Sequence, residues 1–260
     1  MVFNYLKVFL GQLKGGLAIM QSGYFLIADI SGYTEFVQLH TLKQKPLFGK
    51  FMAKNFENHA SIIISDLLES VIEAIEPTMK LHKLEGDAAF FYIEENSQLD
   101  QADKIITAMG KANEAFTNKA SDLLFVQACG CEPCSQSKNL KLKIVAHKGT
   151  CVTQKIRNFE EISGEDVILT HRLLKNNIPS IEYWLVTKEF AKNLSKDNKR
   201  KFSPSSQSIE NFGKIGLLLC EFNSGEPINT DVGKRSRAIN WIIQASYFTK
   251  HTLKSPLRKI

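Results

Sequence analysis

Long hydrophobic runs are missing from this sequence of 260 residues. No uninterrupted apolar stretch approaches the roughly 20 residues that a membrane-spanning helix needs. Residues 1–20 are fairly apolar, but Asn4, Lys7, Gln12 and Lys14 interrupt them, and the segment does not resemble a secretory signal. We therefore expect neither a spanning helix nor a secretory leader, and we expect a cytoplasmic protein.

Cysteine is scarce and odd in number, because the chain has only five. This count favours a reducing compartment in which the thiols are free or bound to metal. Cys129, Cys131 and Cys134 crowd into "ACGCEPCSQ", and their spacing can wrap one Zn²⁺ through thiolates. A fourth ligand could come from His147, from Cys151 or from a thiolate of a second subunit. The alternative interpretation is a loop of free thiols.

Acidic residues are absent from the C-terminal segment 234–260, which carries seven Lys and Arg residues. The whole chain has a net charge of +6, so the basicity belongs to this tail and the rest is near neutral. Ile239, Ile242, Ile243 and Ser246 fall near one helical stripe. A basic amphipathic helix can lie on an anionic membrane, but packing on the body or on a protein partner is favoured here. Nucleic acid is disfavoured, because no recognition motif accompanies the charge.

Apolar segments with strand and helix periods fill the rest of the chain. "TMKLHKLEGDAAFFYI" predicts a β-hairpin that turns at Glu85, Gly86 and Asp87. In the segment before this hairpin, apolar residues recur at helical spacing, and Pro77 ends that helix. Taken along the chain, the patterns predict a strand over 24–29, a helix over 49–74, the hairpin, a helix over 100–118, strands over 140–149 and 151–157, a helix over 164–177, a strand over 182–187, a polar loop over 198–208 and a strand over 216–222.

Hairpins that alternate with crossover helices predict an α+β fold close to the ferredoxin-like plan. In such a fold a mostly antiparallel sheet has helices packed on one of its faces. We expect an N-terminal extension over 1–22, which is either an amphipathic helix or an upstream addition to a chain that begins at Met20. A folded domain over 23–223 follows, with a Cys-rich insert over 128–136. The basic tail over 224–260 is expected to be helical.

Two carboxylates are expected to meet at one edge of the sheet. Asp29 ends the first strand, and Asp87 lies in the hairpin that would pair beside that strand. Like charges disfavour each other there unless a divalent cation binds between them. Mg²⁺ and Mn²⁺ suit oxygen ligands, and Mg²⁺ usually takes one or two carboxylates plus substrate phosphates. Ser31 and Gly32 would turn backbone N–H groups toward a phosphate. Alternatively, Asp29 is a cap or turn residue and Asp87 an ordinary hairpin residue.

Four stretches of the sequence resemble motifs of the class III adenylyl and guanylyl cyclases, and they occur in that family's order. "FLIADISGYTEF" resembles the first metal motif and "KLEGDAAFFY" the second. "IVAHKG" resembles a strand end of the family, and "ISGEDVILTHRLLK" resembles its helix motif. The resemblance covers roughly residues 24–222. It implies the ferredoxin-like class III nucleotide cyclase fold, in a divergent bacterial branch of unknown function that carries a Cys-rich insert.

The resemblance also implies a two-metal site for Mg²⁺ or Mn²⁺. Asp29 and Asp87 match the carboxylates that hold the two metals in the family, and Ile30 matches the residue that supplies a backbone carbonyl. One metal would help to activate the ribose 3′-hydroxyl, and the other would clamp the triphosphate. Ser31 and Gly32 would lie beside that triphosphate.

The nucleotide-binding half of the site follows from the same resemblance. Lys83 matches the adenine-selecting lysine, and Glu161 stands where the family has an adenine-reading Asp. Arg172 matches the catalytic arginine that stabilises charge on the α-phosphate in the transition state. Lys214 matches the triphosphate-binding lysine by a looser alignment. In the family, metals and arginine come from different subunits, so a head-to-tail homodimer is implied.

Three positions depart from the family pattern. Ile168 stands where the family has the Asn that orients the ribose, and an aliphatic side chain cannot hydrogen-bond it. Glu161 is one methylene longer than the expected Asp, and Ser163 replaces an aromatic residue. Losing one positioning contact typically lowers the rate by about 10² to 10³. We expect a cyclase-like domain that binds a divalent metal and a purine nucleoside triphosphate, with weak or lost activity. The alternatives are an active cyclase and a non-catalytic signalling module.

Overall fold

A computed structural model describes residues 19–42, 50–123 and 136–222, together with Ile239, Ile242 and Ser246 of the tail. These three tail residues are helical, and all three are exposed. The rest of the tail, residues 1–18 and the Cys-rich insert lie outside the described residues, so the expectations for those segments stay predictions. Within the described ranges, no helix is both long enough and apolar enough to cross a membrane.

The described elements follow the predicted order with six additions. The helices are α2 (Tyr33–Leu42), α3 (Lys50–Ile75), α4 (Gln101–Asp122), α6 (Glu165–Leu174), α7 (Lys188–Ala191) and α8 (Lys196–Lys199), with the 3-10 helix η2 (Gln136–Asn139). The strands are β1 (Ile19–Ser31), β2 (Lys80–Glu85), β3 (Ala88–Glu94), β4 (Lys141–Ile156), β5 (Phe159–Ser163), β6 (Tyr183–Thr187), β7 (Ser203–Ile209) and β8 (Gly213–Glu221). The additions are α2, η2, β5, α7, α8 and β7.

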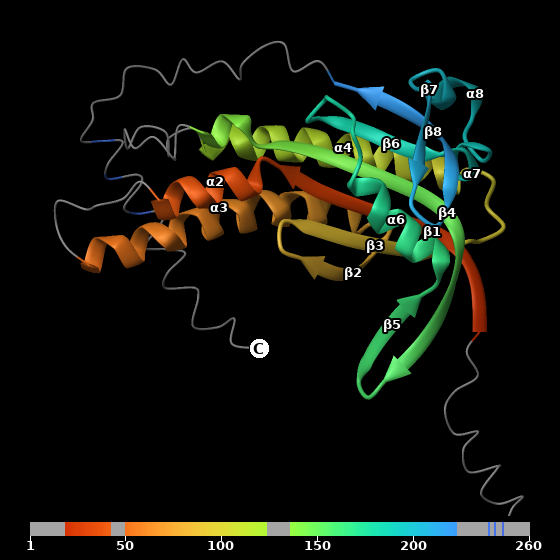
Figure 1. Cartoon of the computed structure of the whole chain (residues 1–260), viewed down its shortest axis with the longest axis horizontal. Helices are drawn as coiled ribbons and strands as arrows, with labels where there is room; N and C mark the ends of the chain where they lie inside the picture. The colour runs from red at the N-terminus through yellow and green to blue at the C-terminus, as the bar shows by residue number, and fades with distance from the viewer. Residues whose placement is uncertain are drawn as a thin grey trace, which may run out of the picture.

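One sheet of eight strands organises the fold (Figure 1). Its order is β2-β3-β1-β4-β6-β8-β7, and β5 pairs with β4 outside this path. The pairing of β4 with β6 is parallel, and the other described pairings are antiparallel. The expected α+β fold with a mostly antiparallel sheet is confirmed.

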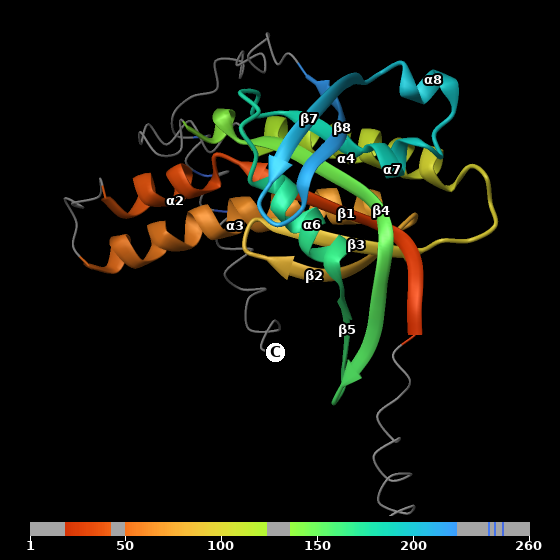
Figure 2. The ribbon, with the colours of Figure 1, turned by 45° about the vertical axis from the view of Figure 1, so that its right-hand side comes forward.

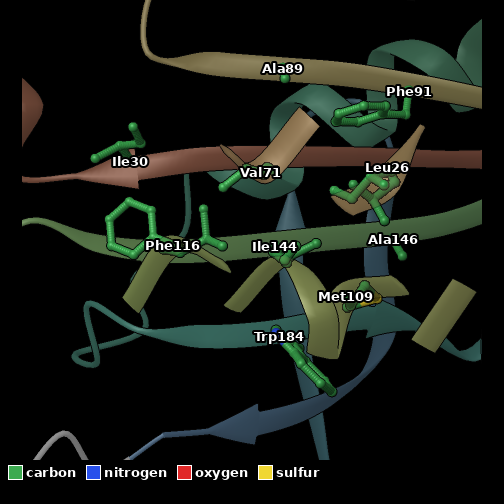
Figure 3. Packing of buried hydrophobic residues seen from close by; sticks show 14 of the residues in the cluster. Leu26, Ile30, Val71, Ala89, Phe91, Met109, Phe116, Ile144, Ala146 and Trp184 are labelled. Carbon is green, nitrogen blue, oxygen red and sulfur yellow. The ribbon is translucent and has the colours of Figure 1, made fainter. Parts of the chain in front are cut away.

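Helices cover both faces of this sheet, so the prediction of helices on one face was wrong. Leu26 and Ala28 of β1 belong to a core cluster with residues of α3 and α4, including Val71 and Met109 (Figure 3). Phe25 and Ile27, which point the other way, pack with Val167 of α6. The reason lies in β1 itself, where residues 23–28 form a continuous buried run. A strand that is apolar on both faces must be covered on both.

Gly149 does not end a strand, as the sequence suggested, but lies inside the single long strand β4. A Cβ atom at this position would lie 2.3 Å from Cγ of Asp166. The glycine therefore makes room for the Asp166 carboxylate of α6. Beyond it, the end of β4 pairs with β5, and this β4–β5 ribbon projects from the body (Figures 1 and 2).

The polar segment 198–208 was predicted to be a loop and instead contains the end of α8 and most of β7. Strand β7 lies at the edge of the sheet and pairs with β8. Its sequence is rich in Ser because an edge strand with exposed side chains needs no apolar face. A hydropathy pattern does not reveal the backbone hydrogen bonds that β7 makes with β8.

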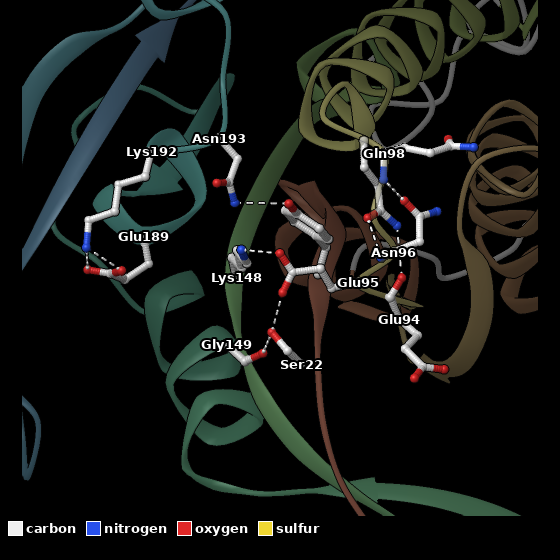
Figure 4. Close-up of polar contacts among 12 residues, drawn as sticks. Ser22, Glu94, Glu95, Asn96, Gln98, Lys148, Gly149, Glu189, Lys192 and Asn193 are labelled. Atoms are coloured by element: carbon white, nitrogen blue, oxygen red, sulfur yellow. Dashed lines mark hydrogen bonds and ion pairs between the residues drawn. The ribbon is translucent and has the colours of Figure 1, made fainter.

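Polar side chains fasten the loop after β3 to the central strands (Figure 4). The hydroxyl of Ser22 in β1 donates to Oε2 of Glu95 at 2.7 Å, and Lys148 of β4 donates to Oε1 of the same carboxylate. These two hydrogen bonds lower the pKa of Glu95. Nearby, the Asn193 amide donates to the Tyr24 hydroxyl at 3.0 Å. A charge-assisted hydrogen-bond network of Ser22, Glu95 and Lys148 thus stabilises the end of the sheet opposite Asp29.

Candidate functional site

The β2–β3 hairpin pairs beside β1 and brings Asp87 next to Asp29, as the sequence predicted. In the register of β1 with β3, Asp29 faces Ala88, the residue that follows Asp87. The backbone N–H of Ile30 donates to the carbonyl of Asp87 at 3.2 Å, which fixes the turn against β1. Burial raises the pKa of Asp87, and the negative charge of Asp29 raises it further. The two carboxylates therefore act on one another.

An open hollow of about 440 Å³ contains both carboxylates. Helix α2 begins at its wall, where Gly32 has a φ of +87° and its carbonyl accepts from the N–H of Phe36 at 3.0 Å. That left-handed conformation suits glycine and turns the chain from strand to helix within two residues. The hollow is lined by Asp29, Ile30, Ser31, Gly32, Tyr33, Thr34, Glu35, Asp87 and Lys143.

Lys143 is the residue of this hollow that sequence reasoning missed. Its ammonium lies 2.8 Å from Oδ2 of Asp29, and the two side chains are 22% and 15% exposed. The contact follows from the sheet, because Lys143 of β4 is the direct partner of Asp29 in the β1–β4 register. The signal was available in the alternation of "LKLKIVAH", which places a basic residue on the same face as Val145 and His147.

The donors of this hollow fit a divalent cation that binds phosphates at the same time. Asp29, Asp87 and a backbone carbonyl such as that of Ile30 offer the oxygen ligands that Mg²⁺ and Mn²⁺ take. Across the described residues, no three His, Cys, Asp or Glu side chains come together as a metal cluster. A cation bound here would therefore complete its shell with water or with ligand oxygens, which is common for Mg²⁺.

A second group of polar residues surrounds the ring of Phe90 on the face covered by α6. The Lys83 ammonium lies 3.2 Å from Oε1 of Glu85, and Nδ1 of His171 lies 3.3 Å from the other oxygen of that carboxylate. The His171 ring is 4.9 Å from the Phe90 ring, between centroids. Lys83, which the resemblance assigns to the base of a nucleotide, is thus paired with an acid of its own strand.

His82 lies beside this group and was not predicted. The register of β2 with β3 shifts between Leu81 and Lys83, so His82 is the extra residue of a β-bulge. Burial lowers the pKa of His82, and the charges of Glu161 and Lys83 both act on it. His82 also lines a cavity of about 660 Å³ between the β2–β3 hairpin and the β4–β5 ribbon, together with Tyr92, Lys80 and Glu160. Lys83 and Glu161 are thus both near enough to act electrostatically on His82, and their role toward a base stays a prediction.

Arg172 and Lys214 lie at the other side of α6. The Arg172 guanidinium donates to the backbone carbonyl of Glu210 at 2.9 Å and lies 3.6 Å from its carboxylate. The same group lies 5.8 Å from the ring centroid of Phe212. Lys214 is exposed on β8, in the same hairpin. Within this chain Arg172 contacts the β7–β8 turn, whereas the resemblance would aim it at a nucleotide held by a second subunit.

His147 and Cys151, two candidate fourth ligands for zinc, are occupied elsewhere. His147 is buried, with Nδ1 at 2.8 Å from the Thr187 hydroxyl and Nε2 at 3.1 Å from Oδ1 of Asp166. Cys151 is buried, and burial raises the pKa of its thiol. Cys129, Cys131 and Cys134 lie outside the described residues, so the zinc site itself stays a prediction.

Comparison with known sequences shows to which protein family the chain belongs. A family profile described as "Protein of unknown function (DUF2652)" matches residues 64–183, a range that includes Asp87 and Arg172 but not Asp29. The "Uncharacterized protein Rv2561/Rv2562" of Mycobacterium tuberculosis is 36% identical over 152 residues, which is 58% of this chain and 69% of the relative. The chain belongs to the family of this mycobacterial protein.

Solved structures similar to this family member are class III cyclases. The adenylyl cyclase CyaB from P. aeruginosa superposes with a TM-score of 0.57 at 12% identity, over 80% of this chain and 97% of that one. The guanylyl cyclase Cya2 gives 0.59 at 12% identity, over 80% and 96%. A class III adenylyl cyclase-like ATP-binding protein from Pseudomonas aeruginosa gives 0.52 at 18% identity, over 71% of this chain and 37% of its own. At these identities the likeness establishes the fold, which is the class III nucleotide cyclase fold.

Proposed function

We propose that this chain is a cyclase-like domain that binds a divalent cation and a purine nucleoside triphosphate but cyclises the nucleotide weakly or not at all. The observation that carries the proposal is the meeting of Asp29 and Asp87 in the hollow at the start of α2. Two like charges at one site disfavour each other, and a shared cation stabilises both.

The phosphates of the nucleotide would lie beside this cation. Ser31, Gly32 and the first turn of α2 line the hollow, and the N-terminus of a helix favours negative charge. When bound beside the phosphates, Mg²⁺ or Mn²⁺ would supply charge neutralisation there. Asp29 and Asp87 would hold the cation, and Ile30 would add a backbone oxygen.

The base would be read by the neighbourhood of Lys83 and Glu161. Both charges act on the pKa of His82, which supports a common neighbourhood for the three side chains. Lys83 would have to exchange its ion pair with Glu85 for a contact with the base. Because Lys83 is half exposed, that exchange is inexpensive: a surface ion pair contributes only about 0–1 kcal/mol.

Two residues of α6 are the reason why we propose weak turnover. Ile168, at the position of the ribose-orienting residue, is 50% exposed and has no group that can hydrogen-bond a hydroxyl. Arg172, the expected catalytic residue, is held on the β7–β8 turn by the carbonyl and carboxylate of Glu210. Lys214 of the same hairpin would bind the triphosphate of the facing site. These features also favour the second candidate function, a non-catalytic signalling module that uses the bound nucleotide only as a ligand.

A homodimer is part of the proposal, because the cation and Arg172 would come from different subunits. The β4–β5 ribbon offers a surface for that contact, since Ile156 and Phe159 at its tip are 55% and 75% exposed. Large exposed apolar side chains on a projecting ribbon are typical of interaction surfaces. The basic tail would contact a protein partner or an anionic membrane.

The Cys-rich insert is proposed to hold a structural Zn²⁺ through Cys129, Cys131 and Cys134. His147 is held in two hydrogen bonds and Cys151 is buried, so the fourth ligand would be a thiolate of the second subunit. The zinc content of purified protein, compared with that of Cys131→Ser, tests this assignment.

Nucleotide binding provides the test of the main proposal. We expect a fluorescent analogue of ATP or GTP to bind in the presence of Mn²⁺ and to lose at least about tenfold in affinity without it. Asp29→Asn and Asp87→Asn should show the same loss. Asp197→Asn, which alters an acid with a 90% exposed side chain on α8, should bind like the unaltered protein. Equal binding by all four proteins with and without Mn²⁺ would contradict the proposed cation site.

A further inference from the structure

The pairing of β1 with β4 places Lys143 beside Asp29 in the hollow at the start of α2. This lysine lies directly opposite Asp29 in the β1–β4 register, and directly opposite residues have their Cβ atoms about 4.5–5.5 Å apart on the same face. Its ammonium lies 2.8 Å from the Asp29 carboxylate. In this conformation the ammonium is a direct neighbour of any cation that Asp29 binds.

The surroundings of Lys143 offer the ammonium few other partners. Its neighbour across the parallel pairing is Tyr183 of β6, which is buried. The carboxylate of Glu182 is already 3.5 Å from the ammonium of Lys141. The Lys143 side chain is only 22% exposed, so most of its stem is covered. The acids left within the hollow are Asp29, Asp87 and Glu35 at the rim.

Before a nucleotide binds, the charges of the hollow balance with one divalent ion. Three carboxylates, from Asp29, Asp87 and Glu35, carry three negative charges when ionised, and Lys143 carries one positive charge. The remaining two negative charges match one Mg²⁺ or Mn²⁺. A second divalent ion would add two positive charges beside the Lys143 ammonium, and such like charges repel strongly at short range.

We propose that Lys143 takes the electrostatic place of a second cation, so that this chain binds one divalent ion at the Asp29–Asp87 corner instead of two. This inference rests on the proposed function and departs from the two-metal expectation that the family resemblance carries. With one ion bound, the ammonium also faces the position of the phosphates and supplies part of the charge neutralisation that a second metal would give.

The stoichiometry of Mn²⁺ binding tests the inference without any measurement of turnover. The full chain is titrated with Mn²⁺ in the presence of a non-hydrolysable purine nucleoside triphosphate, and free Mn²⁺ is followed by electron paramagnetic resonance. We expect one ion per chain in the unaltered protein and in Lys143→Arg, which keeps the charge. Lys143→Met should bind either a second ion or the first ion about tenfold more tightly.

A matched control separates this local effect from the change in net charge. Lys148→Met removes one charge from the same strand, at the residue that pairs with Glu95, and should bind one ion with unchanged affinity. Two ions in the unaltered protein, or the same stoichiometry and affinity in Lys143→Met, would overturn the role of Lys143 and leave the cation site standing. No bound Mn²⁺ in any folded variant would overturn the proposed function as well, with folding checked by circular dichroism.

Discussion

Gly23 has no side chain, and the ring of Tyr92 occupies the space beside it. A Cβ atom there would lie 2.4 Å from Cε2 of that ring and 2.7 Å from the carbonyl oxygen of Ile93. The ring also stacks on Phe25, with centroids 5.4 Å apart, so it cannot move aside freely. The absence of a side chain at Gly23 therefore leaves room for the Tyr92 ring on the face of the sheet beside the β4–β5 ribbon.

Gly23→Ala should therefore lower the free energy of unfolding, by about 1–3 kcal/mol as is typical of overpacking. Urea denaturation measures the change. Gly110→Ala is the matched control, since a Cβ atom there meets only Trp184, at 3.7 Å. Because Gly110 lies inside α4, that substitution should raise the free energy of unfolding by about 0.4–1 kcal/mol. Equal effects of the two substitutions would contradict the packing described for Tyr92.

Asp166 holds α6 against β4, and its contribution to stability should depend on pH. The hydrogen bond from His147 lowers its pKa below the ordinary value of 3.8. The stabilisation is therefore present above pH 3.8 and is lost as the pH falls through the lowered pKa. We expect Asp166→Asn to lower the free energy of unfolding at pH 7 by about 1–2 kcal/mol. The difference should shrink at pH 3, and a constant difference in urea denaturation would contradict this account.

Asp87 should contribute to stability with the opposite sign to Asp166. Burial and the charge of Asp29 raise the pKa of Asp87 above 3.8. The folded state then binds the proton more tightly than the unfolded chain, so ionised Asp87 weakens the fold at neutral pH. Asp87→Asn is expected to stabilise the protein at pH 7 by about 0.5–1 kcal/mol, the scale of charge optimisation. That gain should vanish near pH 3 in the same denaturation series. Destabilisation at pH 7 would show that the carboxylate has a stabilising partner.

At the scale of elements, sequence reasoning succeeded where hydropathy has a clear period. The helix α3, the β2–β3 hairpin and the helix α6 could be predicted because their apolar spacing and turn residues are strong. Strands β5 and β7 could not, since each has only one buried side chain and their order comes from backbone pairing. Asp29 and Asp87 could be predicted to meet, whereas Lys143 and His82 required the register and the bulge.

The β4–β5 ribbon allows a prediction about assembly. Phe159→Ser should raise the dimer dissociation constant by about tenfold or more, because exposed aromatic residues often dominate an interface. Analytical ultracentrifugation measures this constant. Leu99→Ser provides the control, since Leu99 is 96% exposed in the loop before α4, away from the ribbon. A Phe159→Ser protein that associates as tightly as the unaltered chain would contradict the role of the ribbon.

At the scale of the whole molecule, the fold is that of a class III cyclase while the two halves of the expected site differ. The cation half keeps Asp29, Asp87 and the turn into α2 within one hollow. The facing half carries Ile168 without a polar group and Arg172 held by Glu210. We propose that a chain built in this way binds a nucleotide through its phosphates and does not orient the ribose for attack.

The most direct measurement of this account is the rate at which cyclic nucleotide forms from ATP or GTP with Mn²⁺ in the unaltered chain and in Ile168→Asn. We predict a product rate near the background of an Asp29→Asn control in the unaltered chain. The Ile168→Asn protein should form product at least about tenfold faster, because one positioning contact is restored. An unaltered chain that already turns over rapidly, or an Ile168→Asn protein that binds nucleotide with no gain in product, would contradict the account.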